Sequence, residues 1–154
     1  MDLEVGSPAP DFTLPSVEGR TISLSSFAGR KVVLFFYPKD DTSGCTQEAQ
    51  EFDALRDKFA AAGTEVVGIS PDSPKKHRKF LDKYRLDLDL ASDETKSTLE
   101  AYRVWAQKSM WGRKYMGVER TTFLIDREGR IARVWPKVKV PGHAEEVLAA
   151  AQAL

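Results

Sequence analysis

The sequence predicts an α/β sandwich with a mixed central sheet flanked by helices. Apolar runs typical of buried parallel strands alternate with segments of helical periodicity. Two strand-like segments around Gly129 indicate an antiparallel hairpin near the end of the chain. The 154 residues suit one domain, and no linker or repeat divides them. We therefore expect residues 1–154 to form a single domain.

The first third of the chain predicts a hairpin, a buried strand and a helix. Residues 11–16 and 20–27 are short alternating segments, which favours an N-terminal β-hairpin. Residues 31–38, "KVVLFFYP", are nearly all apolar, as in a strand that is buried on both faces. Apolar residues then recur at helical spacing from residue 44 to 62, which predicts a helix there.

The middle of the chain continues the alternation of strand and helix. Residues 64–70, "TEVVGIS", predict a second buried strand. A helix is expected over 72–84, with Ser73 as its N-cap and Pro74 at its first position. Residues 86–92 indicate a third, weaker strand.

The last third closes the sheet with an antiparallel pair. Residues 93–104 predict a short helix. Residues 106–119 are expected to form a packed surface loop, with the lip of a pocket or a contact for a partner as the alternatives. Residues 120–135 contain two strands about a turn. Residues 143–154 predict a final amphipathic helix.

Composition excludes several functions. The 23 basic and 23 acidic residues cancel, so no global field attracts nucleic acid or an anionic membrane. The basic run at 75–79 is expected on the solvent face of its helix. The apolar run at 32–37 is too short to span a bilayer, and the N-terminus lacks the pattern of a signal peptide. These features predict a cytoplasmic protein.

Cysteine and histidine content limits the chemistry further. One cysteine rules out an internal disulfide, and two histidines offer no metal-ligand cluster at useful spacing, so no metal or cofactor is expected. His77 and His143 have no informative local context, and a surface or capping role is expected for each.

The single cysteine, Cys45, follows a buried strand and begins a helix. Unpaired N–H groups and the helix dipole favour the thiolate form there. The Thr42 hydroxyl can cap the helix or contact the sulfur, and Gly44 leaves space beside it for a small substrate. Cys45 also precedes Phe52 by seven residues, so periodicity alone leaves a buried structural cysteine open.

Elimination narrows the possible reactions of this thiol. A Cys-x-x-Cys redox motif would need cysteine at the positions of Thr42 or Glu48. Cysteine hydrolases need a histidine base, which no local pattern indicates. Direct attack of the thiolate on peroxide, giving a sulfenic acid, requires only a reactive and accessible thiol.

The stretch "FFYPKDDTSGCTQE" resembles the active site of peroxiredoxins, with Pro38, Thr42 and Cys45 in the pattern Pro-x-x-x-Thr-x-x-Cys. Within that family the chain is most similar to the bacterioferritin comigratory protein/peroxiredoxin Q subfamily. The resemblance extends in order through "SPAPDFTLPS", "VVLFFYPKDDT", "VVGISPDSPKKHRKF", "SMWGRKYMGVERTTFLID" and "KVKVPGHAEEVL".

The resemblance implies a thioredoxin-like fold with an N-terminal β-hairpin extension. It implies that Cys45 is the peroxidatic cysteine, that Thr42 orients the peroxide and contacts the thiolate, and that Pro38 shields the pocket. Arg120, in "VERTTF", matches the arginine that completes the site from a neighbouring strand. Glu48, one turn into the helix, either holds Arg120 or favours the helix N-terminus.

The chain departs from the subfamily pattern at two positions. Ser43 replaces a proline between the Thr and the Gly, and Gln50 stands where many members carry a resolving cysteine. The resemblance therefore implies an external reductant for the sulfenic acid: thioredoxin, a glutaredoxin- or mycoredoxin-like protein, or a small thiol. It favours a monomer and leaves a dimer open.

Two other activities remain as alternatives to a peroxidase of hydrogen peroxide and organic hydroperoxides. One is a peroxide sensor or redox relay with low turnover. The other is glutathione peroxidase-like activity, which the Thr-x-x-Cys motif with a partner arginine disfavours.

Overall fold

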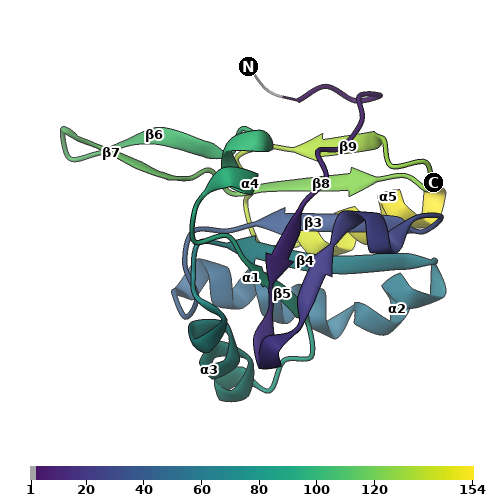
Figure 1. The fold of residues 1–154 in the computed structure, drawn as a ribbon, viewed down its shortest axis with the longest axis horizontal. Helices are drawn as coiled ribbons and strands as arrows, with labels where there is room; N and C mark the ends of the chain where they lie inside the picture. The colour runs from purple at the N-terminus through teal and green to yellow at the C-terminus, as the bar shows by residue number, and fades with distance from the viewer. Residues whose placement is uncertain (1–2) are drawn as a thin grey trace.

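The computed structural model describes residues 3–154 and is built on a five-stranded sheet (Figure 1). Its strands are β3 (Lys31–Phe36), β4 (Thr64–Ser70), β5 (Asp89–Ser92), β8 (Thr121–Ile125) and β9 (Ile131–Trp135). The order across the sheet is β5-β4-β3-β8-β9. β3, β4 and β5 run parallel, whereas β8 pairs antiparallel with both β3 and β9. The mixed sheet predicted from the sequence is confirmed.

Helices pack on both faces of this sheet. They are α1 (Ser43–Ala54), α2 (Arg56–Ala61), α3 (Pro74–Tyr84), α4 (Ser97–Ala101) and α5 (His143–Ala153). One apolar cluster joins the sheet to α1, α2, α3 and α5, and contains Phe35, Phe52 and Phe80. A second cluster on the opposite face contains Phe36 and Tyr102 and includes residues of α4. β3 is central because its residues alternate between these two clusters.

A short N-terminal hairpin covers the second cluster, as the sequence predicts. It consists of β1 (Thr13–Pro15) and β2 (Thr21–Ser23), which pair antiparallel. Leu14 and Ile22 lie opposite each other and are both buried in that cluster. Two 3₁₀ turns, Val17–Gly19 and Leu24–Phe27, follow the two strands.

The expectation of a loop over 106–119 is wrong. This segment forms an antiparallel hairpin of β6 (Trp105–Met110) and β7 (Arg113–Val118), which extends away from the main sheet (Figure 1). Trp111 and Gly112 both have positive φ, 51° and 77°, as in a two-residue type I′ turn. The sequence pattern does not predict this hairpin, because tryptophan is unusual at the first position of such a turn.

Three elements are shorter than the sequence predicts. The single helix expected over 44–62 is interrupted at Leu55, whose N–H bonds to the carbonyl of Phe52 three residues back. The strand expected over 86–92 begins at Asp89, and the helix expected over 93–104 is confined to α4. The predicted Ser73 cap is confirmed, because its hydroxyl accepts the N–H of Lys76.

Among the described residues, none of the helices is both long enough and apolar enough to cross a membrane.

The close approach of three strands predicts the effect of one substitution. Gly68 of β4 pairs with Phe35 of β3 and with Leu90 of β5. A Cβ atom at Gly68 would lie 2.6 Å from Phe35 Cζ and 2.8 Å from Leu90 Cδ2. Gly68→Ala is therefore expected to lower the free energy of unfolding by about 1–3 kcal/mol, measured by urea denaturation.

Gly117→Ala is the matched control, because Gly117 is also in a strand but its Cβ would meet nothing nearer than 3.4 Å. Its free energy of unfolding should stay within about 0.5 kcal/mol of the wild type. Equal losses in the two variants would contradict the argument from close packing.

Candidate active site

Cys45 lies in the first turn of α1, immediately beyond the end of β3. Thr42 precedes the helix with extended backbone angles, and its carbonyl accepts the N–H of Thr46. The first N–H groups of a helix have no partner within it and carry partial positive charge. Cys45 is a free thiol and is only 1% exposed. Only a small reactant can therefore reach this sulfur.

Arg120 links this thiol to a buried carboxylate. Its Nη2 donates to Cys45 Sγ at 3.3 Å, and its Nη1 donates to Glu48 Oε1 at 2.7 Å. Arg120 stands directly before β8, and Thr121 pairs with Phe36 at the end of β3. Sheet pairing thus brings together residues that are 75 positions apart. Of the two roles expected for Glu48, the structure shows the contact with Arg120.

Gly44 allows this close approach. A Cβ atom at Gly44 would lie 3.2 Å from Arg120 Nη2, which is tighter than ordinary contact. The sequence predicts that Gly44 leaves space for a substrate. In the structure, the guanidinium of Arg120 lies beside that space.

Thr42 and Pro38 border the turn but do not touch the sulfur through a hydrogen bond. The Thr42 hydroxyl donates to the carbonyl of Lys39 at 2.9 Å, and it neither caps α1 nor bonds to Cys45. Pro38 is half buried between β3 and the turn. Gln50 stands where many members of the subfamily carry a resolving cysteine, and its side chain is exposed on α1.

The charged groups nearest the thiol are the guanidinium of Arg120 and the buried carboxyl group of Glu48. Burial raises the pKa of Glu48 to about 7, although the nearby Arg120 opposes this shift. Glu48 Oε2 is buried without a hydrogen-bond partner. Glu48 and Cys45 raise the pKa of Arg120 against the effect of burial, so Arg120 stays positively charged.

Lys108 is a further cation near the site that sequence reasoning missed. It projects from β6 and is half buried, with its stem beside Gly117. Burial and the positive charge of Arg120 lower the pKa of Lys108, whereas Glu119 and Cys45 oppose that shift. Detecting Lys108 from sequence would have required recognition of the β6–β7 hairpin.

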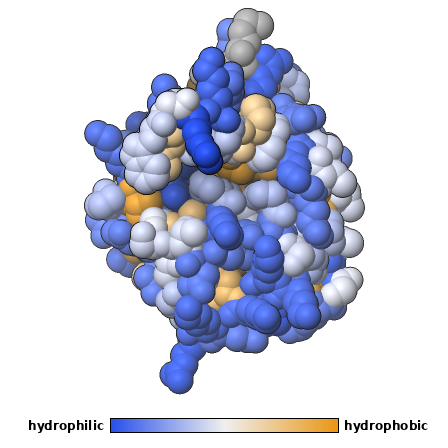
Figure 2. Space-filling model, turned by 90° about the vertical axis from the view of Figure 1, so that its left-hand side faces the viewer, coloured by the Kyte–Doolittle hydropathy of each residue, from blue (hydrophilic) through white to orange (hydrophobic). Residues whose placement is uncertain are grey.

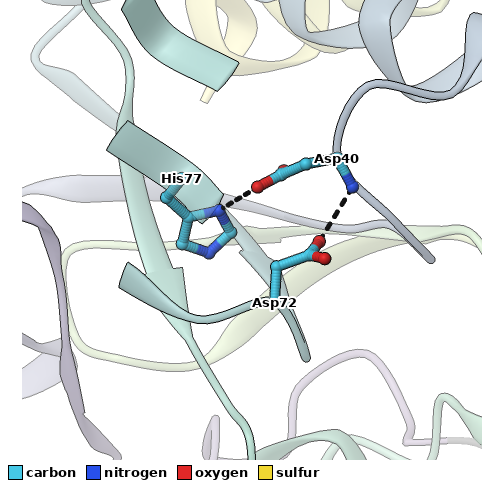
Figure 3. Close-up of side chains that lie close together, drawn as sticks. All are labelled: Asp40, Asp72 and His77. Carbon is cyan, nitrogen blue, oxygen red and sulfur yellow. Dashed lines mark hydrogen bonds and ion pairs between the residues drawn. The ribbon is translucent and has the colours of Figure 1, made fainter. Parts of the chain in front are cut away.

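A second polar network surrounds His77 of α3 (Figure 3). It lies beside residues 37–42, which join β3 to α1 and are called the catalytic turn below. His77 Nδ1 bonds to Asp40 Oδ2 at 2.6 Å, and its Nε2 faces the Ala91 carbonyl at 3.2 Å. The Tyr37 hydroxyl donates to Asp40 Oδ1 at 2.6 Å. Asp72 Oδ2 accepts the backbone N–H of Asp40 at 2.8 Å.

These contacts bring together residues that their spacing in the sequence does not connect. Asp40, Asp72 and His77 form a cluster whose ligand atoms lie within 4.8 Å of one another, although their sequence spacing shows no metal motif. Protein groups already bond to both ring nitrogens and both oxygens of Asp40, so the donor set fits a hydrogen-bonded network better than a metal site.

Both histidines are buried and neither is an N-cap residue, whereas a surface or capping role was expected for each. His77 is fully buried, and the lysines of its basic run remain outside. His143 lies at the start of α5, where its Nε2 is 2.9 Å from Thr122 Oγ1. Burial lowers the pKa of His143 to about 4, so it is neutral near pH 7.

Comparisons with known proteins place the chain in one family. A family model described as the AhpC/TSA family matches residues 5–134. The chain is 53% identical over 148 residues to a putative peroxiredoxin bcp of Coxiella burnetii, covering 96% of this chain and 98% of that protein. It is 46% identical over 148 residues to the peroxiredoxin Bcp of Bacillus subtilis, covering 96% and 94%.

The solved structures give the same result. The Xanthomonas campestris bacterioferritin comigratory protein, studied for its alkyl peroxide reduction activity, matches with a TM-score of 0.90 and 40% identity. The match covers 98% of this chain and 96% of that protein. The thioredoxin-like fold implied by the sequence resemblance is therefore confirmed.

The burial of Glu48 predicts how stability depends on pH. Because its pKa is about 7 in the folded protein and 4.5 in the unfolded chain, the folded state binds a proton more tightly. This contribution to stability is complete below about pH 4.5 and is lost as the pH rises through about 7. The unfolding free energy of the wild type, relative to Glu48→Gln, should fall by about 3 kcal/mol across this range.

Urea denaturation of both proteins at several pH values measures this difference. Glu145→Gln is the control, because Glu145 is an exposed carboxylate on α5. A wild-type advantage over Glu48→Gln that does not change with pH would show that Glu48 titrates as an ordinary carboxylate.

Proposed function

The chain belongs to the AhpC/TSA family and is a peroxiredoxin, and from this premise we propose that it reduces hydrogen peroxide and organic hydroperoxides through a sulfenic acid on Cys45. The observation that carries the proposal is the 3.3 Å contact between Arg120 Nη2 and Cys45 Sγ at the start of α1. A cation and a helix N-terminus meet at the only thiol of the chain.

In the first half-reaction, the thiolate of Cys45 attacks the terminal oxygen of the peroxide. A sulfur–oxygen bond forms and the oxygen–oxygen bond breaks. The other oxygen leaves as hydroxide or alkoxide and takes a proton. Arg120 and the first N–H groups of α1 are positioned to stabilise the charge as it moves from sulfur to the leaving oxygen.

Thr42 supplies the proposed orienting group. Its hydroxyl hydrogen is given to the Lys39 carbonyl, so lone pairs of the oxygen are left to accept the O–H of a peroxide. This would turn the peroxide with its second oxygen toward Arg120. Pro38, half buried beside the turn, would help to keep water from the pocket.

Ionisation of the thiol is too small an effect to account for catalysis. A free cysteine thiol is a few per cent ionised at pH 7, so complete ionisation gains roughly thirtyfold, or about 2 kcal/mol. Enzymes typically lower the barrier by at least about 8 kcal/mol. Most of the acceleration must therefore come from orientation of the peroxide and from stabilisation of the leaving oxygen.

The second half-reaction needs a thiol from outside the chain, because Cys45 is its only cysteine. The sulfenic acid and the external thiol form a mixed disulfide and water. A second thiol then releases Cys45. Thioredoxin, a glutaredoxin-like protein or a small thiol can supply these groups.

Mass spectrometry after one equivalent of peroxide tests the proposed function. Cys45 should gain one oxygen, and added thiol should remove it. With excess peroxide and a thiol-reducing system, the protein should then turn over many times. Consumption that stops near one equivalent would instead identify a sensor or relay, and a Cys45 that remains a free thiol would overturn the proposal.

Arg120→Met tests the role of the guanidinium. The rate of sulfenic acid formation should fall by at least about a hundredfold, as on loss of an oxyanion donor. This fall should exceed what the change in thiolate fraction explains, with thiolate followed by ultraviolet absorbance. Arg133→Met, which alters an exposed arginine of β9, should leave the rate unchanged. If the rate falls only as much as the thiolate fraction does, Arg120 acts only by promoting ionisation of the thiol, and the proposed role in stabilising the leaving oxygen is wrong.

A further inference from the structure

A groove lies beside the turn between β3 and α1. It has a volume of about 340 Å³ and lies between the turn after β3 and helix α3. Figure 2 views the end of the molecule that is on the left in Figure 1, and its lower part, at the level of α3, is mostly hydrophilic. The groove is lined by Lys39, Asp40, Asp41, Asp72, Lys76, Lys79, Phe80 and Lys83.

The positive charges of this groove exceed its accessible negative charges. Asp41 is neutralised by Lys83 at 2.8 Å. Asp40 and Asp72 are buried, and they are bonded to His77 and to the hydroxyl of Ser70 respectively. Lys39, Lys76 and Lys79, in contrast, have no ion-pair or hydrogen-bond partner for their ammonium groups among residues 3–154. Three unpaired ammonium groups around one hollow favour an anionic ligand.

The groove borders the turn that leads to Cys45, because Lys39, Asp40 and Asp41 line it. The carbonyl of Lys39 accepts the Thr42 hydroxyl, and Thr42 directly precedes α1. The Asp40 N–H is bonded to Asp72 beneath the groove (Figure 3). A ligand held by Lys39 and the lysines of α3 is therefore held next to the segment that carries Cys45.

We propose that this groove binds the carboxylates of an acidic low-molecular-weight thiol, which reduces the sulfenic acid of Cys45. The inference rests on the proposed function, because it names the reductant of that site. The volume is at the lower end of the range for small-molecule sites. Lysine ammonium groups pair with carboxylates, and Phe80 offers an apolar contact to the body of the ligand.

The chemistry balances without another reactant. The thiol sulfur attacks the sulfur of the Cys45 sulfenic acid, a disulfide bond forms, and the hydroxyl leaves as water with the thiol proton. A second molecule of the same thiol attacks the mixed disulfide. Cys45 is released as a thiol, and the two small thiols leave as their disulfide.

The kinetic test compares glutathione, which carries carboxylates at both ends, with the neutral thiol 2-mercaptoethanol. The paired variant Lys76→Gln/Lys79→Gln removes two charges from the groove. Lys58→Gln/Lys114→Gln is the matched control, because it removes two exposed charges from α2 and β7. Each rate constant is measured on protein whose Cys45 sulfenic acid has first been verified by mass spectrometry.

The groove variant should lose roughly tenfold in its rate with glutathione and nothing with 2-mercaptoethanol. The control variant should match the wild type with both thiols. Added salt should slow the wild type with glutathione and should have little effect on the groove variant. Equal losses with the two thiols, or an equal loss in the control variant, would overturn the proposal.

A binding measurement separates this inference from the proposed function. S-methylglutathione cannot react, so calorimetry on the reduced protein tests the groove whether or not Cys45 forms a sulfenic acid. Binding that is weakened in the groove variant supports the site. No binding by the wild type overturns it. A sulfenic acid that only a protein dithiol reduces would also overturn it, while leaving the proposed function intact.

Discussion

The guanidinium of Arg120, shared between a thiol and a buried carboxylate, is the interaction on which the rest of the site depends. It lies 3.3 Å from Cys45 Sγ and 2.7 Å from Glu48 Oε1. A buried charge is stable only when it is paired, so α1 and the start of β8 must keep a fixed distance. The antiparallel pairing of Phe36 with Thr121 sets that distance. The central sheet therefore positions the ion pair of Arg120 and Glu48 as well as forming the core of the fold.

The other side of the catalytic turn is held by a separate network. Tyr37 and His77 both bond to the carboxylate of Asp40, and Asp72 accepts its backbone N–H. Each of these groups is buried. Loss of one partner would leave another without a hydrogen bond, which is costly in a low-dielectric interior. Cys45 is thus carried on a segment that is anchored to β8 at one end and to α3 at the other.

Features that depend on neighbouring residues could be predicted from the sequence, whereas contacts between residues far apart in the chain could not. The buried strands and the position of Cys45 could be predicted because apolar runs and helix starts are local patterns. Arg120 came only from the family resemblance, since its partner lies 75 positions away. The buried role of His77 was missed because its basic neighbours mask it and Asp40 is 37 positions earlier. The β6–β7 hairpin was missed because Trp111 occupies a turn position that usually holds asparagine or glycine.

The two half-reactions place different demands on one buried sulfur. Cys45 is 1% exposed, which suits a small peroxide but not the approach of a second sulfur atom on a larger molecule. Between the two anchors of the turn, Asp41, Thr42 and Ser43 are all exposed. Asp41 also has a left-handed φ of 62° and is held mainly by Lys83 and Tyr84 of α3. Because these three residues are exposed, moving them costs less buried surface than moving the anchored residues on either side. Asp41 also lines the groove beside α3, so a ligand bound there would contact this exposed part of the turn.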